Sequence, residues 1–77
     1  MDEPITLEQL RERAGVTKRE TARRMGMTHQ NVMRIEEDGS APIKTLEKYA
    51  AAINATFAEV AEAARTTYQV KLNYHIS

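Results

Sequence analysis

The chain contains closely spaced signals for helix starts. This spacing restricts the fold more than any other feature of the sequence, because it leaves room only for short helices. Several Thr residues are followed three positions later by Glu or Gln, among them Thr6 by Gln9, Thr17 by Glu20, and Thr56 by Glu59. This spacing lets the two side chains satisfy the unpaired amides at a helix start. Thr28 can cap one further helix alone. The sequence therefore predicts a helix start at each of these four threonines.

Stop signals divide the chain in the same way. Gly15 and Gly26 can adopt the left-handed conformation that ends a helix, and Asn54 can adopt it at some cost. Pro42 suits the first turn of a helix, because its missing amide hydrogen costs nothing there. Together the signals predict five helices, at residues 6–14, 17–25, 28–37, 42–53 and 56–65.

Apolar residues recur three and four positions apart within these ranges, as they do on the buried face of a helix. The predicted core positions are Leu7, Leu10, Ala14, Ala22, Met25, Val32, Ile35, Leu46, Tyr49, Ala50, Ile53, Phe57, Val60, Ala61 and Ala64. The expected fold class is therefore all-α, a five-helix bundle that occupies residues 1–65.

The last stretch, residues 66–77, changes its period. Apolar and polar residues alternate from residue 68 to residue 76, which is typical of a half-buried β-strand. A lone strand leaves its backbone unpaired, so we expect it to pair with the same segment of a second molecule. A disordered tail and a strand added to a partner protein's sheet are the alternatives. The expected dimerisation residues are Tyr68, Val70, Leu72, Tyr74 and Ile76.

Composition narrows the class of protein. A chain of 77 residues forms one domain with a small core, to which a partner chain would add stability. It has no cysteine, which removes disulfides and thiolate metal sites. The longest apolar stretch, residues 49–53, is too short to cross a bilayer. We expect a cytoplasmic protein without membrane contact, cofactor or metal.

An enzyme is the least expected class. The two histidines, His29 and His75, are far apart in the chain, and neither a glycine-rich phosphate loop nor a pair of inward carboxylates is visible. His75 lies on the polar face of the expected strand, with no second metal ligand near it in the sequence.

The formal net charge is zero, whereas a nucleic-acid-binding domain usually has a basic excess. The charges are unevenly distributed, because residues 11–34 hold seven basic and two acidic residues, a local charge of +5. Such charges are often solvated helix faces. A single basic side is nevertheless what a DNA-binding protein needs.

Residues 17–37 have the clearest functional pattern. Two short helices are joined by a tight turn at Gly26 and Met27, and the second helix, capped by Thr28, is rich in polar side chains. In the helix-turn-helix arrangement the second helix enters the major groove of DNA. The same geometry also occurs in helical hairpins that have no such role.

The sequence around this segment resembles the Cro/C1-type (XRE) helix-turn-helix family, which includes phage repressors. The resemblance covers about residues 6–60 and rests on LRERAGVT at residues 10–17, ARRMGMT at 22–28 and VMRIE at 32–36. Residues 43–57 are similar to plasmid copy-control repressors and to antitoxins of the HigA type. The resemblance implies a repressor that binds a palindromic operator in double-stranded DNA as a homodimer.

The resemblance also implies which side chains meet DNA. It assigns base contacts to His29, Gln30, Met33 and Arg34, and phosphate-backbone contacts to Lys18, Arg19, Thr28 and Asn31. The chemistry agrees, because Gln can hold adenine and Arg can hold guanine through two hydrogen bonds, while Met can pack on a thymine methyl. Gln30 and Arg34 are the strongest candidates, and Asn31 suits either a base or the backbone.

Some positions depart from the family pattern. Thr21 stands where a large apolar residue is usual, so the packing there is expected to be thinner. Glu37 and Asp38 are expected in the loop after the second helix of the motif, where their charge would oppose phosphate binding. Arg11 and Glu36 match a salt bridge of the phage repressors and are expected to be part of the scaffold.

Three functions are compatible with the sequence. The first is a DNA-binding repressor, and the second is an antitoxin that neutralises a partner protein and autoregulates its operon. The third is a helix-turn-helix domain that makes only protein contacts, which the zero net charge favours. An adjacent gene for a small basic toxin would favour the second, whereas salt-dependent binding of random duplex DNA would argue against the third.

Overall fold

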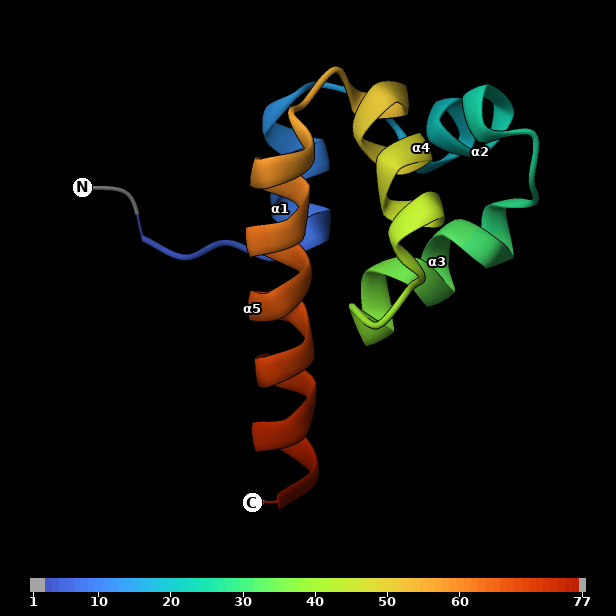
Figure 1. Cartoon of the computed structure of the whole chain (residues 1–77). Helices are drawn as coiled ribbons and strands as arrows, with labels where there is room; N and C mark the ends of the chain where they lie inside the picture. The colour runs from blue at the N-terminus through green and yellow to red at the C-terminus, as the bar shows by residue number, and fades with distance from the viewer. Residues whose placement is uncertain (1–2, 77) are drawn as a thin grey trace.

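The computed structural model describes residues 3–76, with side chains up to residue 73, as a bundle of helices. These are α1 (Leu7–Arg13), α2 (Lys18–Met25), α3 (His29–Asp38), α4 (Ile43–Ile53) and α5 (Phe57–Ile76). α1 packs beside the first half of α5, α2 to α4 lie to one side, and the last turns of α5 extend past the other helices (Figure 1). The bounds of α1 to α4 agree with the predicted ranges to within one residue.

Threonine caps begin α1, α2, α3 and α5, as predicted. Thr6 accepts a hydrogen bond from the amide of Gln9, and the Gln9 side chain accepts one from the amide of Thr6. Thr56 and Glu59 form the same reciprocal pair. Such a pair satisfies two amides that have no partner inside the helix. The predicted helix starts are therefore confirmed, including those at Thr17 and Thr28.

Left-handed residues end three of the helices. Gly26 ends α2 with φ +66°, and Asn54 ends α4 with φ +60°. Both were predicted as stops. Gly39 ends α3 with φ +67°, a role that the sequence analysis did not assign to it.

The core lies between all five helices. Leu7, Val32, Tyr49, Ile53 and Val60 are fully buried within it. Most of the predicted core positions are confirmed, but Ala14 and Phe57 are exposed. On α5 the buried stripe is Val60, Ala63, Ala64 and Thr67, so the helix is rotated relative to the predicted inward face.

Thr21 fits the core although it is polar. Its side chain is completely buried, and its hydroxyl donates a hydrogen bond to the carbonyl of Thr17 at 2.8 Å. This bond satisfies the hydroxyl, so burial leaves no unpaired polar group. The position is packed, contrary to the expected thinner contact.

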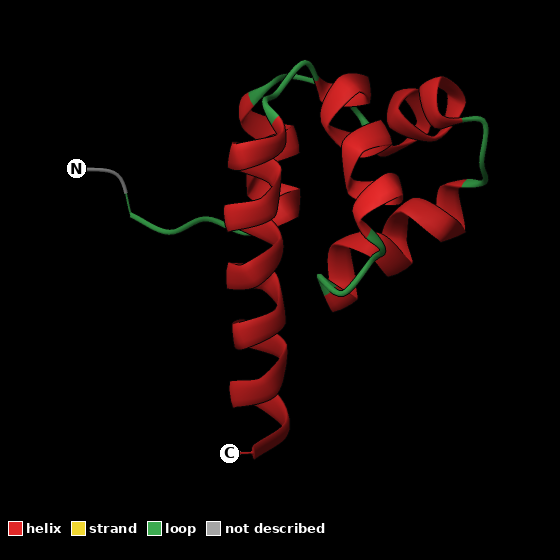
Figure 2. Cartoon of the chain, viewed as in Figure 1, coloured by secondary structure: helices red, strands yellow, loops and turns green. Residues whose placement is uncertain are grey.

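The predicted C-terminal strand is wrong, because α5 continues to Ile76 and residues 3–76 contain no strand (Figure 2). A strand would need a neighbour for its backbone, whereas a helix that has already formed gains one backbone hydrogen bond for each residue added. Of the predicted dimerisation residues, Tyr68, Val70 and Leu72 are exposed. The side chains of Tyr74 and Ile76 lie outside the described residues. The proposed division at residue 65 therefore falls inside one helix.

Polar contacts attach the middle of α5 to the bundle. The hydroxyl of Thr67 accepts a hydrogen bond from the amide of Leu7 at 2.9 Å, and it donates one to the carbonyl of Ala63. Lys71 forms an ion pair with Asp38 at the end of α3. These contacts hold α5 against both α1 and α3. Among the described residues, none of the helices has both the length and the hydropathy to span a membrane.

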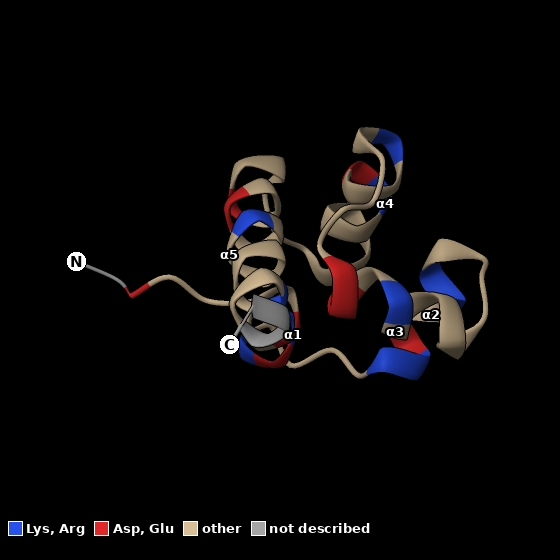
Figure 3. Cartoon of the chain, turned by 90° about the horizontal axis from the view of Figure 1, so that it is seen from below, with Lys and Arg blue, Asp and Glu red and all other residues tan. Residues whose placement is uncertain are grey.

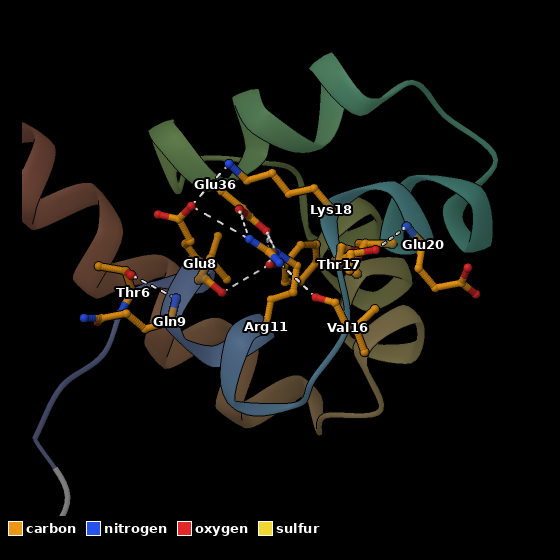
Figure 4. Close-up of polar contacts among 12 residues, drawn as sticks. Thr6, Glu8, Gln9, Arg11, Val16, Thr17, Lys18, Glu20 and Glu36 are labelled. Atoms are coloured by element: carbon orange, nitrogen blue, oxygen red, sulfur yellow. Dashed lines mark hydrogen bonds and ion pairs between the residues drawn. The ribbon is translucent and has the colours of Figure 1, made fainter.

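A buried charged network connects α1, α3 and α4. Arg11 Nε lies 2.7 Å from Glu36 Oε2, and Arg11 also donates to the carbonyl of Val16 (Figure 4). The hydroxyl of Tyr49 donates to Glu36 at 2.6 Å. The predicted scaffold salt bridge is confirmed. Burial lowers the pKa of Arg11, but the hydrogen bond and the charge of Glu36 outweigh burial and raise it. Burial and the bond to Glu36 also raise the pKa of Tyr49.

Candidate nucleic-acid interface

Helices α2 and α3 form a helix-turn-helix unit. Gly26 reverses the chain after α2, and Thr28 caps α3 by accepting a hydrogen bond from the amide of Asn31 at 3.2 Å. Ala22, Val32 and Ile35 are buried and hold the two helices against the core. The opposite side of α3 is left open to solvent.

The open side of α3 contains the residues predicted to contact bases. His29, Gln30 and Arg34 are exposed, and Met33 is half-buried. Gln30 and Arg34 are four positions apart, so they lie on one face of the helix. Within the described residues Arg34 forms no ion pair, so its five N–H donors are available to an external acceptor.

A shallow groove separates α2 from the first turn of α3. Its polar lining is Arg19, Arg23, Thr28, His29 and Gln30. Two predicted backbone contacts, Arg19 and Thr28, thus line the same groove as two predicted base contacts, His29 and Gln30. Arg23 was not predicted, although its place one turn after Arg19 on α2 indicates that the two share a face.

Lys18 differs from the other predicted backbone contacts. Its ammonium group lies 3.2 Å from Glu8 on α1, and its side chain is only 29% exposed (Figure 4). Arg19 is exposed and forms no ion pair within the described part of the chain. The hydroxyl oxygen of Thr28 accepts the capping bond from Asn31, which leaves its O–H group as a donor, and the side chain of Asn31 is exposed.

Internal pairs occupy much of the local positive charge. Glu20 forms ion pairs with Arg23 and Arg24, and the two arginines hold the pKa of Glu20 down at about 2. Arg24 also donates to the carbonyl of Ala52 on α4 at 2.6 Å. Arg13 lies elsewhere, in a cavity beside the first half of α5. The basic excess between residues 11 and 34 is therefore only partly available to a ligand.

The acidic residues at the end of α3 lie away from this interface. Glu37 and Asp38 form the last turn of α3 and not the predicted loop. Glu36 is buried with Arg11, and Asp38 pairs with Lys71. Figure 3 shows the acidic end of α3 between α5 and the basic segments of α2 and α3. Of the three carboxylates in this turn, those of Glu36 and Asp38 have internal partners. The repulsion of DNA phosphates that the sequence predicts is therefore reduced.

No metal site accompanies these residues. Among the side chains that the structure describes, up to residue 73, no three His, Asp or Glu are grouped so that they could hold an ion. The arrangement offers hydrogen-bond donors, acceptors and positive charge on an open surface, which suits binding of a large polyanion.

A short capped helix, a glycine turn and a second helix with an exposed polar face, held on a helical core, define a helix-turn-helix protein. A family model for the helix-turn-helix domain matches residues 5–66. The chain therefore belongs to the helix-turn-helix domain family, which places it in the class of DNA-binding regulators. Comparisons with curated proteins and with solved structures gave no significant match.

Proposed function

We propose that this protein is a transcriptional repressor that binds a palindromic operator as a homodimer and has no enzymatic activity. The observation that carries the proposal is the exposed face of α3, where Gln30 and Arg34 lie beside the groove lined by Arg19. The resemblance of residues 6–60 to the Cro/C1-type (XRE) family supports the choice of a repressor.

The proposed binding mode follows from the arrangement of α2 and α3. The first turns of α3 enter the major groove while α2 crosses the phosphate backbone. Arg34 then holds a guanine and Gln30 an adenine, each through two hydrogen bonds, and Met33 packs on a thymine methyl. Arg19 and the amides at the start of α2 meet phosphates, which fixes the register without reading sequence.

Replacing Arg34 by Ala tests the proposed recognition face. We expect Arg34→Ala to weaken operator binding by about 1–3 kcal/mol and to relax the preference at one base pair, because a bidentate contact to guanine is lost. The operator is obtained first by selection from random duplexes, and dissociation constants are measured by fluorescence anisotropy over a range of salt concentrations.

The control is Lys48→Ala, which also removes one positive charge, from an exposed position on α4. Lys18→Ala should weaken binding to all sequences alike, because a phosphate contact carries no base preference. If Arg34→Ala keeps its helical content and shows the wild-type preference at every base pair of the operator, another face of the protein reads the DNA.

The homodimer part of the proposal is supported by an apolar stripe on α5. Phe57, Tyr68 and Leu72 are 41%, 44% and 40% exposed, and their spacings of eleven and four put them on one side of the helix. Arg65 lies next to this stripe, and Glu62 lies beyond Arg65 on the same exposed side of the helix. An antiparallel pair of α5 helices, related by a two-fold axis between residues 63 and 64, would bring Arg65 of each copy toward Glu62 of the other. A second copy of the chain therefore fits this face in both apolarity and charge.

Glutamate substitutions on α5 test this dimer. We expect Leu72→Glu and Tyr68→Glu to convert a dimer to a monomer in sedimentation equilibrium and to weaken binding of a palindromic operator, because each buries a charge in the interface. Val70→Glu is the control, since Val70 is 54% exposed but lies on the other side of α5. Equal masses for Leu72→Glu and wild type would rule out this interface.

The α5 stripe also supports a second candidate, an antitoxin whose partner protein occupies the same face. This candidate predicts a small basic protein, encoded by an adjacent gene, that binds wild-type protein but not the Tyr68→Glu variant. A wild-type protein that sediments as a monomer alone and forms such a complex would favour the antitoxin.

A further inference from the structure

Two carboxylates at or beside α2 are bound to basic residues of the same chain. Glu8 on α1 lies 3.2 Å from the ammonium group of Lys18 at the start of α2, and 3.8 Å from Nη2 of Arg11. Glu20 contacts both Arg23 and Arg24 one turn further along α2. Each pair is partly open to solvent, so each can exchange its internal partner for an external anion.

Arg23 is the most accessible of these basic groups. Its side chain is 71% exposed and lines the groove together with His29 and Gln30. Arg24 differs, because its second bond, to the carbonyl of Ala52, attaches it to α4. Glu20 therefore restrains a guanidinium in the groove where α2 and α3 would meet the edge of a DNA duplex.

We propose that Glu8 and Glu20 act as internal counter-anions, which occupy Lys18 and Arg23 in the free protein and so lower its affinity for DNA of any sequence. This inference rests on the proposed DNA-binding function. It makes the two glutamates positioning residues for the basic side chains, and it assigns them no base contact.

DNA binding at Arg23 exchanges one anion for another. A phosphate that binds Arg23 must displace the carboxylate of Glu20, which then remains nearby as an unpaired negative charge close to the DNA backbone. Non-specific binding depends almost wholly on basic side chains that replace condensed counterions. A basic side chain that already has an internal partner releases its own carboxylate instead, so its contribution to that binding is smaller. The hydrogen bonds from Arg23 and Arg24 lower the pKa of Glu20, so the contacts that a phosphate must replace stabilise the charged carboxylate.

The test measures binding of wild type, Glu8→Gln and Glu20→Gln to a random-sequence 30-base-pair duplex over a range of salt concentrations. Glutamine has nearly the same shape as glutamate without the charge. We expect each variant to bind about three- to tenfold more tightly at low salt, with a log–log salt slope steeper by about one. The control is Glu47→Gln, which removes the same charge from an exposed, unpaired position on α4 among the described residues.

A double substitution separates this role from a structural one. In the Arg23→Gln background, Glu20→Gln should produce a smaller gain in affinity than in wild type, because the most exposed group that it releases is absent and only the pair with Arg24 remains. Thermal unfolding of each variant shows whether the fold is retained. Affinities of Glu8→Gln and Glu20→Gln no higher than that of Glu47→Gln would overturn the inference. If the wild-type protein itself does not bind duplex DNA in a salt-dependent way, the proposed function fails before the variants are compared.

Discussion

Gly39→Ala is expected to destabilise the protein more than a substitution by Ala at Gly15 or Gly26. Gly39 has φ +67°, a backbone conformation that residues with a Cβ rarely adopt. An added Cβ would overlap the carbonyl oxygen of Ala64 and would lie 2.8 Å from the amide nitrogen of Tyr68. Both are backbone atoms of α5 and cannot rotate away, so the end of α3 would have to move off α5.

We expect Gly39→Ala to lower the free energy of unfolding by about 3 kcal/mol or more, since backbone strain and overpacking add. For a domain of this size, such a loss lowers Tm by at least about 12 °C. The measurement is thermal unfolding followed by circular dichroism.

Gly26→Ala is the matched control for this prediction. Gly26 has nearly the same φ, +66°, but no atom lies within 4 Å of the position of its Cβ. Gly26→Ala should therefore lose only the stability that the left-handed conformation costs a residue with a Cβ, about 1 kcal/mol. If the two variants unfold at the same temperature, close packing of Gly39 on α5 contributes nothing to stability.

Glu36→Ala is expected to have the second large effect, because it leaves Arg11 buried without its nearest carboxylate, and the other, Glu8, is 3.8 Å away and half exposed. Arg11 and Glu36 are 5% and 7% exposed. Removing one partner of a buried pair typically costs about 3–5 kcal/mol, since the remaining charge has lost its solvation and its partner. Tyr49 also loses the acceptor of its 2.6 Å hydrogen bond, although it keeps a bond to the carbonyl of Leu7. Urea denaturation monitored by circular dichroism measures the loss.

The neighbouring residue provides the control for Glu36. Glu37→Ala removes the same side chain from an exposed position and should change stability by no more than about 0.5 kcal/mol. The double variant Arg11→Met, Glu36→Leu should lose less stability than the sum of its single variants, because no unpaired charge remains in the core. Additive losses would show that Arg11 and Glu36 do not act as a pair.

Gly39 and Glu36 both position the last turn of α3, which the proposed function needs in a fixed position. Glu36 attaches this turn to α1 and α4, and Gly39 allows it to approach α5. The exposed face that holds Gln30 and Arg34 begins two turns earlier on the same rigid helix. We infer that this attachment, and not the groove residues themselves, sets the orientation of α3 relative to the rest of the bundle.

Much of the fold and of the proposed site is readable from the sequence because the determining interactions are local. A threonine and the amide three residues later meet within one turn, so Thr6, Thr17, Thr28 and Thr56 mark helix starts without any tertiary context. The left-handed stops at Gly26 and Asn54 are equally local. Resemblance to a known family was needed to pair Arg11 with Glu36, because they are 25 positions apart.

The errors in the sequence analysis arise where local signals are ambiguous. The alternation from Tyr68 to Leu72 fits a strand, but it also fits a helix that is exposed on two sides, and only the absence of a neighbouring strand decides between them. Phe57 was placed inward for its hydrophobicity, yet the buried stripe of α5 is determined by where α1 and α3 pack. Neither fact can be read from the residues of α5 alone.

The sequence by itself therefore determined the four short helices, their caps, and the exposed polar face of α3, since each depends on residues within about one helical turn of one another. Only the tertiary structure decided that residues 66–76 are helical and that Gly39 packs against the backbone of α5. It also decided which basic residues have internal partners: Lys18 is paired across helices with Glu8, whereas Arg19 and Arg34 have no ion pair among the described residues. The physical reason is that these outcomes depend on distances between segments far apart in the chain, and such distances exist only once the helices have packed.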